Sequence, residues 1–341
     1  TGQYAGMPAA KPYQKGNPDI TWESTNTTNL GIETRLFDRV TITADVYNRN
    51  NSRLLYYVPL PAMTGYSGIW DNIGEINNKG FELTVEPEII KGKDFSWNIN
   101  FNISYNRNRV IALYEGQPIT SGQTRIEEGY DMDSWYTRLW YGVNPGNGEP
   151  LWEKIIDNGD GTTSVELTNL YSDATLQFTG HKRSPDFTGG LINEFRYRGF
   201  SLTANIGFVE GIYLYNSNRE LFDSDGSYPT FNNMNLASGW SRWEKPGDLA
   251  THPQPIMGGN HDAHKTSSRF MEDASYIRLR NISLAYQLPQ DLVRKLSISN
   301  LTVSLNADNL VTVSKWSGMD PETGSLYPVS KKYLLGLKVD F

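Results

Sequence analysis

Carboxylate side chains stand at several places in the sequence where acid–base chemistry is conceivable: Glu33, Asp45, Glu82, Glu86 and Asp308. Hydrolysis of a glycosidic bond uses two carboxyl groups that flank the bond. These five residues, however, follow the every-second-residue alternation of their own segments, and a polar strand face in a water-filled lumen explains that spacing without catalysis. The sequence also lacks a phosphate loop, a nucleophile elbow and a zinc-hydrolase motif. We therefore predict that the five carboxylates face a lumen and that the chain is not an enzyme.

Aromatic side chains offer a second kind of chemistry, the binding of ligands with flat faces. An aromatic ring that stacks on a sugar buries about 150–250 Å². The tryptophans in or near the predicted loops are Trp70, Trp135, Trp140, Trp152, Trp240 and Trp243. They are candidates for substrate contact, and the packing of loop against loop or against a lid protein is the open alternative.

Two short segments have the composition of metal sites but not the spacing. Residues 157–161 read Asp-Asn-Gly-Asp-Gly, yet they lack the alternation of an EF-hand loop and its Glu at the twelfth position. His261 and His264, with His252 nearby, have no third ligand at a suitable spacing. We predict no cofactor and no metal, with a structural calcium in residues 157–161 as the alternative.

The element that must position these residues is clearest between Phe95 and Tyr105, where apolar residues take every odd place and Ser or Asn every even place. Successive side chains of a strand point to opposite faces, so this segment has one apolar and one polar face. Eleven residues at about 3.3 Å each, tilted by about 40°, span about 25 Å, the height of the lipid-facing band of an outer-membrane barrel. Taken alone, the pattern would suit a soluble β-sandwich equally well.

Similar alternation recurs in residues 30–36, 40–47, 81–86, 187–197, 200–208, 277–288, 301–308 and 333–341. The connections alternate between short turns and long loops, and long loops are predicted for residues 48–76 and 209–273, with further loop over 1–24. A change of phase near Arg280 predicts a β-bulge. Residues 134–144 and 149–156 form either a hairpin or an elaborated loop, which gives eleven or nine strands.

Composition excludes several classes of protein. The chain has 341 residues, a net charge of −7 and a pI near 5.3, which argues against a nucleic-acid partner. No run of 18 apolar residues occurs, so a helical membrane span is not predicted. Without cysteine there is no disulfide and no thiol catalysis. No signal peptide begins at Thr1, which favours either a cytoplasmic protein or a processed piece of a longer one.

An odd strand number follows from the turns, because the first strand begins on the long-loop side and the last one ends on the short-turn side. Bacterial single-chain barrels have an even number of strands, so we predict that this chain does not close alone and that the preceding strands are on other polypeptide. The last strand ends in an alternating apolar row that resembles the assembly signal of outer-membrane barrels: Tyr333, Leu335, Leu337, Val339 and Phe341.

Several motifs together resemble the C-terminal part of a SusC/RagA-type TonB-dependent outer-membrane transporter of Bacteroidetes. They are NPDITWE (17–23), NIGEINNKGFEL (72–83), SPDFTGG (184–190), ASYIRLRNISLAYQLP (274–289) and LNADNL (305–310). The resemblance implies a 22-stranded barrel of which residues 1–341 are roughly the last half. It also implies an N-terminal plug and a TonB box, which this chain lacks, and a SusD-like lipoprotein lid.

The sequence thus predicts an all-β chain, the last nine to eleven strands of a transmembrane antiparallel β-barrel in the bacterial outer membrane, with short periplasmic turns and long extracellular loops. The predicted partners are the rest of the barrel and its plug, the lid, the TonB complex, the lipid bilayer and an oligosaccharide or peptide ligand. Nutrient import, with oligosaccharide favoured over peptide, is the predicted function. The rivals are a lid-less siderophore or cobalamin receptor and a soluble carbohydrate-binding β protein.

Overall fold

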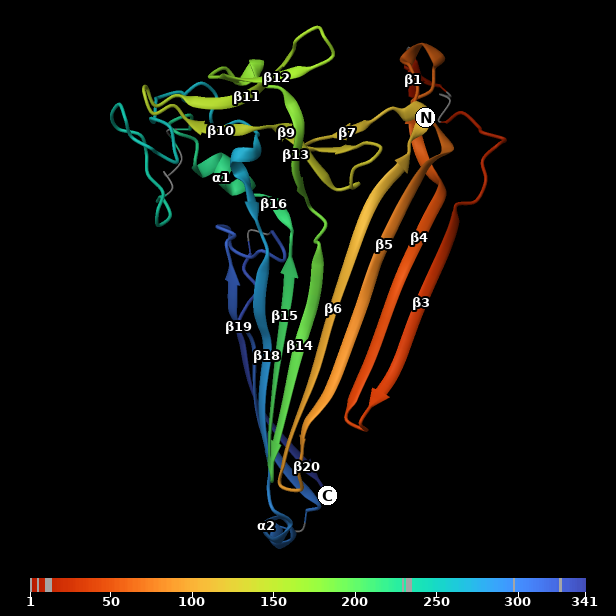
Figure 1. Ribbon diagram of the computed structural model, residues 1–341, viewed down its shortest axis with the longest axis vertical. Helices are drawn as coiled ribbons and strands as arrows, with labels where there is room; N and C mark the ends of the chain where they lie inside the picture. Colours follow the sequence, from red (N-terminus) through yellow and green to blue (C-terminus); the bar gives the residue numbers. More distant parts are fainter. Residues whose placement is uncertain are drawn as a thin grey trace.

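The computed structural model describes residues 2–4, 6–9, 14–228, 230, 235–296, 298–324 and 327–341. Within this part of the chain nine strands pair into one antiparallel sheet in the order β20-β19-β18-β15-β14-β6-β5-β4-β3. Their bounds are Ser24–Leu36 (β3), Val40–Pro59 (β4), Gly68–Lys91 (β5), Phe95–Ala112 (β6), Phe187–Tyr197 (β14), Phe200–Glu210 (β15), Tyr276–Gln287 (β18), Asn300–Ser314 (β19) and Lys332–Asp340 (β20). The sheet is a tall wall with β3 and β20 as its free edges (Figure 1). The nine-strand prediction is confirmed, and the described strands do not close into a barrel.

Short connections join the strands at one end of the wall. Residues 37–39 link β3 to β4, 92–94 link β5 to β6, and 198–199 link β14 to β15. Phe37, Asp38 and Arg198 adopt positive φ angles, which turn the chain back within two or three residues in register with the strand twist. The connection from β18 to β19 is the longest of this set and holds α2 (Gln290–Val293) and η5 (Arg294–Leu296).

The opposite end of the wall carries the long connections, which fold into a structured cap (Figure 1). We call residues 113–186 and 211–275 the loop cap. Its first part holds two small sheets. One consists of β7 (Ile119–Ser121), β8 (Thr124–Ile126), β9 (Ser134–Arg138) and β13 (Leu176–Lys182), and the other of β10 (Trp140–Val143), β11 (Pro150–Asp157) and β12 (Thr163–Thr168). The short helices η2 (Tyr114–Gly116) and η3 (Tyr171–Asp173) belong to the same part. Its second part holds β16 (Tyr213–Tyr215), α1 (Ser217–Phe222), η4 (Ser268–Phe270) and β17 (Met271–Asp273). The elaborated-loop interpretation of residues 134–156 is therefore correct, with a β10–β11 hairpin inside it.

Two loop predictions were wrong in extent. Residues 48–76 are mostly strand, because β4 and β5 stay paired from Asn51 opposite Ile76 to Pro59 opposite Gly68, and only residues 60–67, with η1 (Ala62–Thr64), connect them. Residues 1–24 include β1 (Gly2–Tyr4) and β2 (Met7–Ala9), which pair with each other. Residues 1, 5, 10–13, 229 and 231–234 of the predicted loops lie outside the described residues. Apolar and polar residues alternate only where one face of a strand contacts lipid. Where the strand extends beyond the bilayer, both faces contact water and the alternation ends.

The predicted bulge near Arg280 is confirmed. Asn205 pairs with Asn281 and Ile206 pairs with Leu279, so Arg280 has no partner on β15. The register between β18 and β19 shifts at the same place. The extra residue restores the apolar row of β18 to the outer face, because each slip of one residue exchanges the two faces of a strand.

Apolar side chains of the wall are exposed rather than packed in a core. Leu30, Ile32, Leu305, Leu335 and Leu337 are 52–80% exposed. Many of the buried apolar side chains lie instead in the loop cap, including Trp135, Trp152, Ala174, Trp243, Ala263, Phe270 and Ala274. An exposed apolar wall of this size requires a lipid environment. Among the described residues no helix is long and apolar enough to cross a bilayer.

Aromatic rings bound the apolar band at both ends. Toward the short turns, Trp97 stacks on Phe195 with ring centroids 5.4 Å apart, and Phe200 stacks on Tyr286 at 4.3 Å. Toward the loop cap, Tyr105 lies between Phe81 and Phe187, at 5.7 Å and 5.1 Å. Aromatic belts at these positions are typical of the two interfaces of a membrane.

Candidate functional site

The polar face of the wall is hollowed between β3 and β6. A cavity of about 620 Å³ opens there, and its lining is entirely polar: Thr27, Asn29, Asp45, Tyr47, Arg49, Asn51, Asn78, Glu82 and Asn106. These side chains share one face because Asp45 is paired with Glu82, and Tyr47 with Gly80, which is itself paired with Asn106. The concave face is therefore the polar one, and the apolar face is convex.

Amide side chains connect the strands across this cavity. The Tyr47 hydroxyl donates to the Asn106 Oδ1 at 3.0 Å, and the Asn106 Nδ2 donates to the Asn78 Oδ1 at 3.3 Å. The Asn108 Nδ2 donates to the same Asn78 oxygen at 3.0 Å. We call this chain of residues the amide ladder. Each amide still has a donor or acceptor to offer, so the ladder can bind hydroxyl or amide groups of a ligand.

A second hollow of about 430 Å³ lies on β3–β6 and β14 near the short turns. Arg35 and Lys91 both pair with Glu88, at 3.1 Å and 2.9 Å, and the Asn100 Nδ2 donates to Glu86. These ion pairs are exposed to solvent, so they contribute little to stability. Their arrangement gives the lower part of the polar face mixed charge, without a dominant sign.

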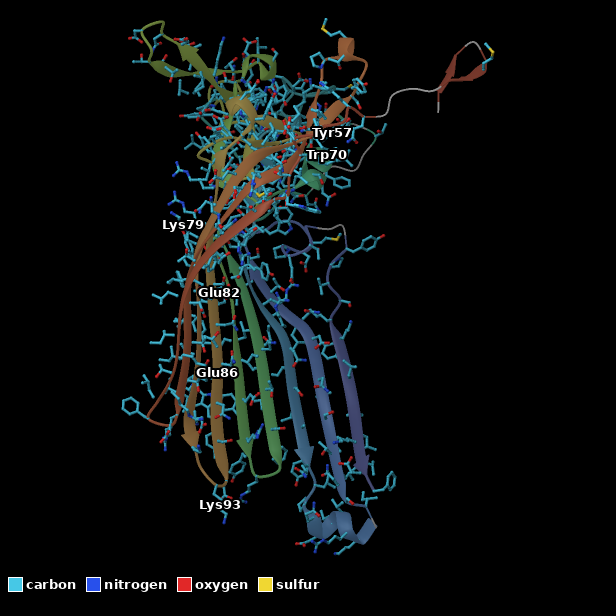
Figure 2. The ribbon with its side chains drawn as sticks, turned by 90° about the vertical axis from the view of Figure 1, so that its right-hand side faces the viewer. Tyr57, Trp70, Lys79, Glu82, Glu86 and Lys93 are labelled. Carbon is cyan, nitrogen blue, oxygen red and sulfur yellow. The ribbon has the colours of Figure 1, made fainter. Side chains whose placement is uncertain are left out.

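All five predicted carboxylates lie on the polar face, but they do not gather into a catalytic pair. Glu82 and Glu86 follow one another down β5, between Trp70 at one end and Lys93 at the other (Figure 2). Asp45 is paired with Glu82, whereas Glu33 lies opposite Thr43. Asp308 is far along the sheet on β19, where it accepts a hydrogen bond from Asn281 at 2.7 Å. Their predicted position in a lumen stays a prediction for the closed barrel.

Three of the six candidate tryptophans are buried within the loop cap. Trp152 has no exposed surface, and Trp140 packs edge-on against it with ring centroids 5.6 Å apart. The Trp135 Nε1 donates to the Tyr213 carbonyl at 2.8 Å, and the Trp243 Nε1 donates to the Pro145 carbonyl at 3.0 Å. Trp135, Trp152 and Trp243 therefore pack loop against loop, which was the alternative interpretation.

The other three tryptophans retain some exposed surface. Trp70 lies on β5, not in a loop, and is 40% exposed beside Tyr57, with ring centroids 5.4 Å apart. Trp140 and Trp240 are half-buried under guanidinium groups, Arg269 at 4.9 Å and Arg219 at 4.3 Å from the respective ring centroids. Substrate contact by Trp70, Trp140 and Trp240 stays a prediction.

The terminal row is placed as its alternation predicted. Tyr333, Leu335, Leu337 and Phe341 are exposed, and Val339 is half-buried. Leu335 pairs with Leu305, and Leu337 pairs with Val303, on the outer face. The role of this row as an assembly signal stays a prediction.

The loop cap contains a buried charge cluster that the sequence did not predict. The side chains of Asp223 and Asp225 have no exposed surface. Asp223 accepts from the Arg219 Nη2 at 3.0 Å and from the His252 Nε2 at 2.7 Å, while Asp225 accepts from Arg269 and from the Arg242 Nη1 at 2.7 Å. Apart from Arg219, four positions before Asp223, these partners are 17 to 44 positions away in sequence, so only the folded cap brings them together. The cluster fixes the segment that carries Trp240.

In the two segments whose composition resembles a metal site, side chains form hydrogen bonds and ion pairs within the protein. The Asp157 Oδ1 accepts from the Gly159 N–H and the Asp160 Oδ1 from the Thr162 N–H, each at 2.9 Å, as in a hydrogen-bonded turn. His252 bonds Asp223, and the His261 Nε2 lies 3.2 Å from the Glu149 Oε1. In the part of the chain that the structure describes, no three His, Asp or Glu side chains converge as metal ligands would.

Comparison with known proteins connects this wall to one family. Residues 1–310 match the family model described as "TonB dependent receptor-like, beta-barrel". The TonB-dependent receptor P39 of Formosa agariphila is 28% identical over 99% of this chain and 37% of its own length. The TonB-dependent receptor SusC of Bacteroides thetaiotaomicron is 26% identical over 95% of this chain and 32% of its own length.

A solved structure of the RagAB peptide transporter superposes with a TM-score of 0.83 at 28% identity, covering 96% of this chain and 36% of the matched one. The chain therefore spans about a third of the length of the relatives that it matches.

Proposed function

The chain belongs to the TonB dependent receptor-like β-barrel family, whose members lie in the outer membrane, and from this premise we propose that it forms the wall of a transporter that imports an oligosaccharide. The observation that carries the proposal is the amide ladder, most of which lines a polar cavity of about 620 Å³ on the face opposite the lipid-facing rows. Amides, carboxylates and a tyrosine hydroxyl together suit the many hydroxyl groups of a sugar chain.

The proposal extends to partners that this chain does not contain. Similarity to SusC and the motifs quoted above support a SusD-like lipoprotein lid over the loop cap. A plug within the closed barrel would receive energy from the TonB complex of the inner membrane. A lid-less siderophore or cobalamin receptor would purify without a lipoprotein.

A peptide is the second candidate substrate. Similarity to the RagAB peptide transporter favours it, and so does the burial of Trp135, Trp152 and Trp243, which removes three sugar-stacking surfaces. The amide groups of a peptide and the hydroxyl groups of a sugar can both form hydrogen bonds with the amide ladder. The choice between the two substrates therefore requires a binding experiment.

Replacing Asn78 with alanine is expected to weaken nutrient binding by the complete transporter about 3–10-fold, because the ladder loses its shared acceptor and each neutral hydrogen bond contributes about 0.5–1.5 kcal/mol. The measurement is calorimetric titration of the purified, lid-bound protein with oligosaccharide and peptide mixtures. Asn77→Ala is the matched control, because Asn77 is the same residue type, one position away, and bonds Asn48 on the outer face. Equal losses for Asn77→Ala and Asn78→Ala would contradict the proposed site.

A further inference from the structure

Three basic side chains gather on the outer face of the wall, and the proposed import does not use them. Lys79 on β5 is paired with Arg107 on β6, and Arg109 follows two residues further along the same face. We call these three residues the basic triad. All three are exposed, and within the described residues none of them forms an ion pair. Three unneutralised cations on a lipid-facing wall need an anionic partner or water.

The height of the basic triad is fixed by its neighbours. Phe81, two residues after Lys79, is paired with Tyr105, two residues before Arg107, and both rings belong to the aromatic belt next to the loop cap. Below this belt the outer face is apolar, and directly above it comes the triad. Aromatic belts lie at the level where acyl chains give way to headgroups, so the triad lies at the level of the headgroups of the outer leaflet.

The intervening residues point the other way. Asn78 and Asn108 alternate with the triad along β5 and β6 and belong to the amide ladder of the concave face. On the outer face the triad is flanked instead by Asn48 and Asn77, which bond each other at 2.7 Å. The outer surface thus offers cations for phosphate and amides for sugar hydroxyl groups in one place.

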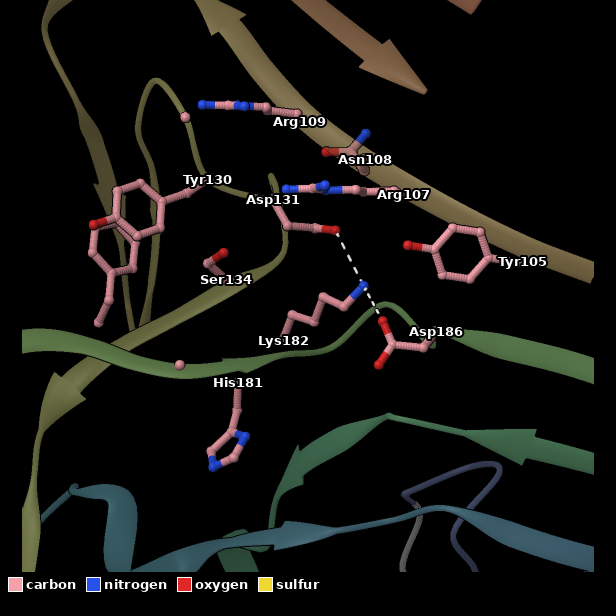
Figure 3. A pocket seen from close by; sticks show the side chains of 13 residues that line it. Tyr105, Arg107, Asn108, Arg109, Tyr130, Asp131, Ser134, His181, Lys182 and Asp186 are labelled. Atoms are coloured by element: carbon pink, nitrogen blue, oxygen red, sulfur yellow. Dashed lines mark ion pairs between the residues drawn. The ribbon is translucent and has the colours of Figure 1, made fainter. Parts of the chain in front are cut away.

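A hollow of about 320 Å³ adjoins Arg107 and Arg109, where β6 continues beyond its pairing with β14 (Figure 3). Lys182 crosses its far side between Asp186 at 2.9 Å and Asp131 at 3.7 Å, so Lys182 is paired and the far side carries one negative charge in excess. The positive charge of the hollow is therefore on the β6 side, at Arg107 and Arg109, next to the ring of Tyr105.

We propose that the basic triad binds the phosphate groups of a phosphorylated glycolipid of the outer leaflet. Arginine matches phosphate geometry with paired N–H donors, and lysine adds a point charge. The acyl chains of the same lipid pack on the apolar rows below Phe81 and Tyr105. A soluble phosphate has no use for that adjoining apolar surface, so the lipid is the occupant that the whole arrangement fits.

The test uses the complete, delipidated protein in phosphatidylethanolamine nanodiscs. The probe is bis-phosphorylated lipid A, compared with dephosphorylated lipid A that has the same acyl chains and with inorganic phosphate as a competitor, and bound lipid is counted by native mass spectrometry. The triple variant K79Q/R107Q/R109Q is expected to bind the probe about a hundredfold more weakly, since each cation near an anionic headgroup contributes about a fivefold effect. Lys93→Gln is the matched control, because Lys93 is exposed at the short-turn end of the same β5–β6 hairpin.

The proposal is supported if the triple variant loses the bis-phosphorylated probe, Lys93→Gln retains it, and the dephosphorylated lipid binds the wild-type protein as weakly as the probe binds the variant. It is overturned if the two lipids bind the wild-type protein alike or if inorganic phosphate displaces the probe. It is also overturned if the triple variant binds the probe as well as the wild type does, even if its oligomeric mass differs. Arg109→Gln alone, with an expected fivefold loss, serves if the triple variant fails to assemble. Nutrient binding is measured on the same samples, so a failure of the transport proposal is seen separately.

Discussion

Replacing Asp223 with alanine is expected to destabilise the loop cap by about 3–5 kcal/mol, the usual cost of removing one partner from a buried ion pair. Asp223 is fully buried and accepts hydrogen bonds from Arg219 and His252, with the Arg269 Nη2 3.6 Å away. Without the carboxylate these guanidinium groups remain buried with one counter-ion fewer, since Arg219 keeps Glu272 at 2.8 Å and Arg269 keeps Asp225. Hydrogen exchange of residues 211–275 in the complete protein measures the effect as faster opening of this segment.

The matched control is Asp262→Ala. Asp262 pairs with Lys265 at 3.0 Å, but both side chains are 48% exposed, so the loss should be about 1 kcal/mol or less. An Asp223→Ala variant whose cap exchanges no faster than that of Asp262→Ala would show that the buried cluster does not hold the cap.

The same cluster predicts a pH dependence. Burial by itself would raise the pKa of Asp223, but the hydrogen bond from His252 and the guanidinium groups of Arg269 and Arg219 hold the pKa at about 2, below its ordinary value of 3.8. Because the folded pKa is the lower one, the ionised carboxylate stabilises the cap fully above pH 3.8, and this contribution is lost as the pH falls through about 2. Cap opening should therefore accelerate in that interval in the wild type and change less in Asp223→Asn.

Replacing Phe101 with arginine should destabilise the assembled barrel by about 2–4 kcal/mol, the cost of a cation on the lipid face near the bilayer midplane. Phe101 lies near the middle of the apolar band, opposite Val85 on β5 and Leu191 on β14. Denaturant unfolding of the complete protein in lipid vesicles, followed by tryptophan fluorescence, gives the change in the free energy of unfolding.

Asn102→Arg is the control for this substitution. Asn102 is the next residue of β6, is exposed on the polar face and would keep its new cation in water. Its cost should be within about 1 kcal/mol of zero. A larger penalty at position 102 than at position 101 would reverse the assignment of the two faces.

The membrane part of the fold could be predicted because lipid imposes a simple pattern. The alternation of residues 95–105 fixed both the strand and its outer face, and even the bulge at Arg280 was visible as a change of phase. Above the bilayer this constraint ends. Residues 48–52 are polar on both faces, so the extension of β4 to Pro59 left no pattern, and Trp70 was placed in a loop although it lies on β5.

The candidate site was only partly predictable for a related reason. Alternation placed Asp45 and Glu82 on one face, but the amide ladder depends on the register between strands, which the positions of the asparagines in the sequence do not specify. The loop cap depends on contacts such as Asp225 with Arg269, which are set by tertiary packing. Aromatic composition likewise could not separate the buried Trp152 from the exposed Trp70.

The assignment of the apolar face to lipid and the polar face to water is tested most directly by spin labels on single cysteines. The cysteines are introduced one at a time at positions 98–104 of the complete protein in lipid vesicles, since this chain has no cysteine of its own. The measurement is the accessibility of each spin label to oxygen, which concentrates in the acyl region, and to a water-soluble nickel complex. The odd positions, Ile99, Phe101 and Ile103, should report oxygen, and the even positions should report the nickel complex. Labels that respond in the opposite phase, or with no alternation, would contradict a wall whose apolar face meets lipid and whose polar face meets water.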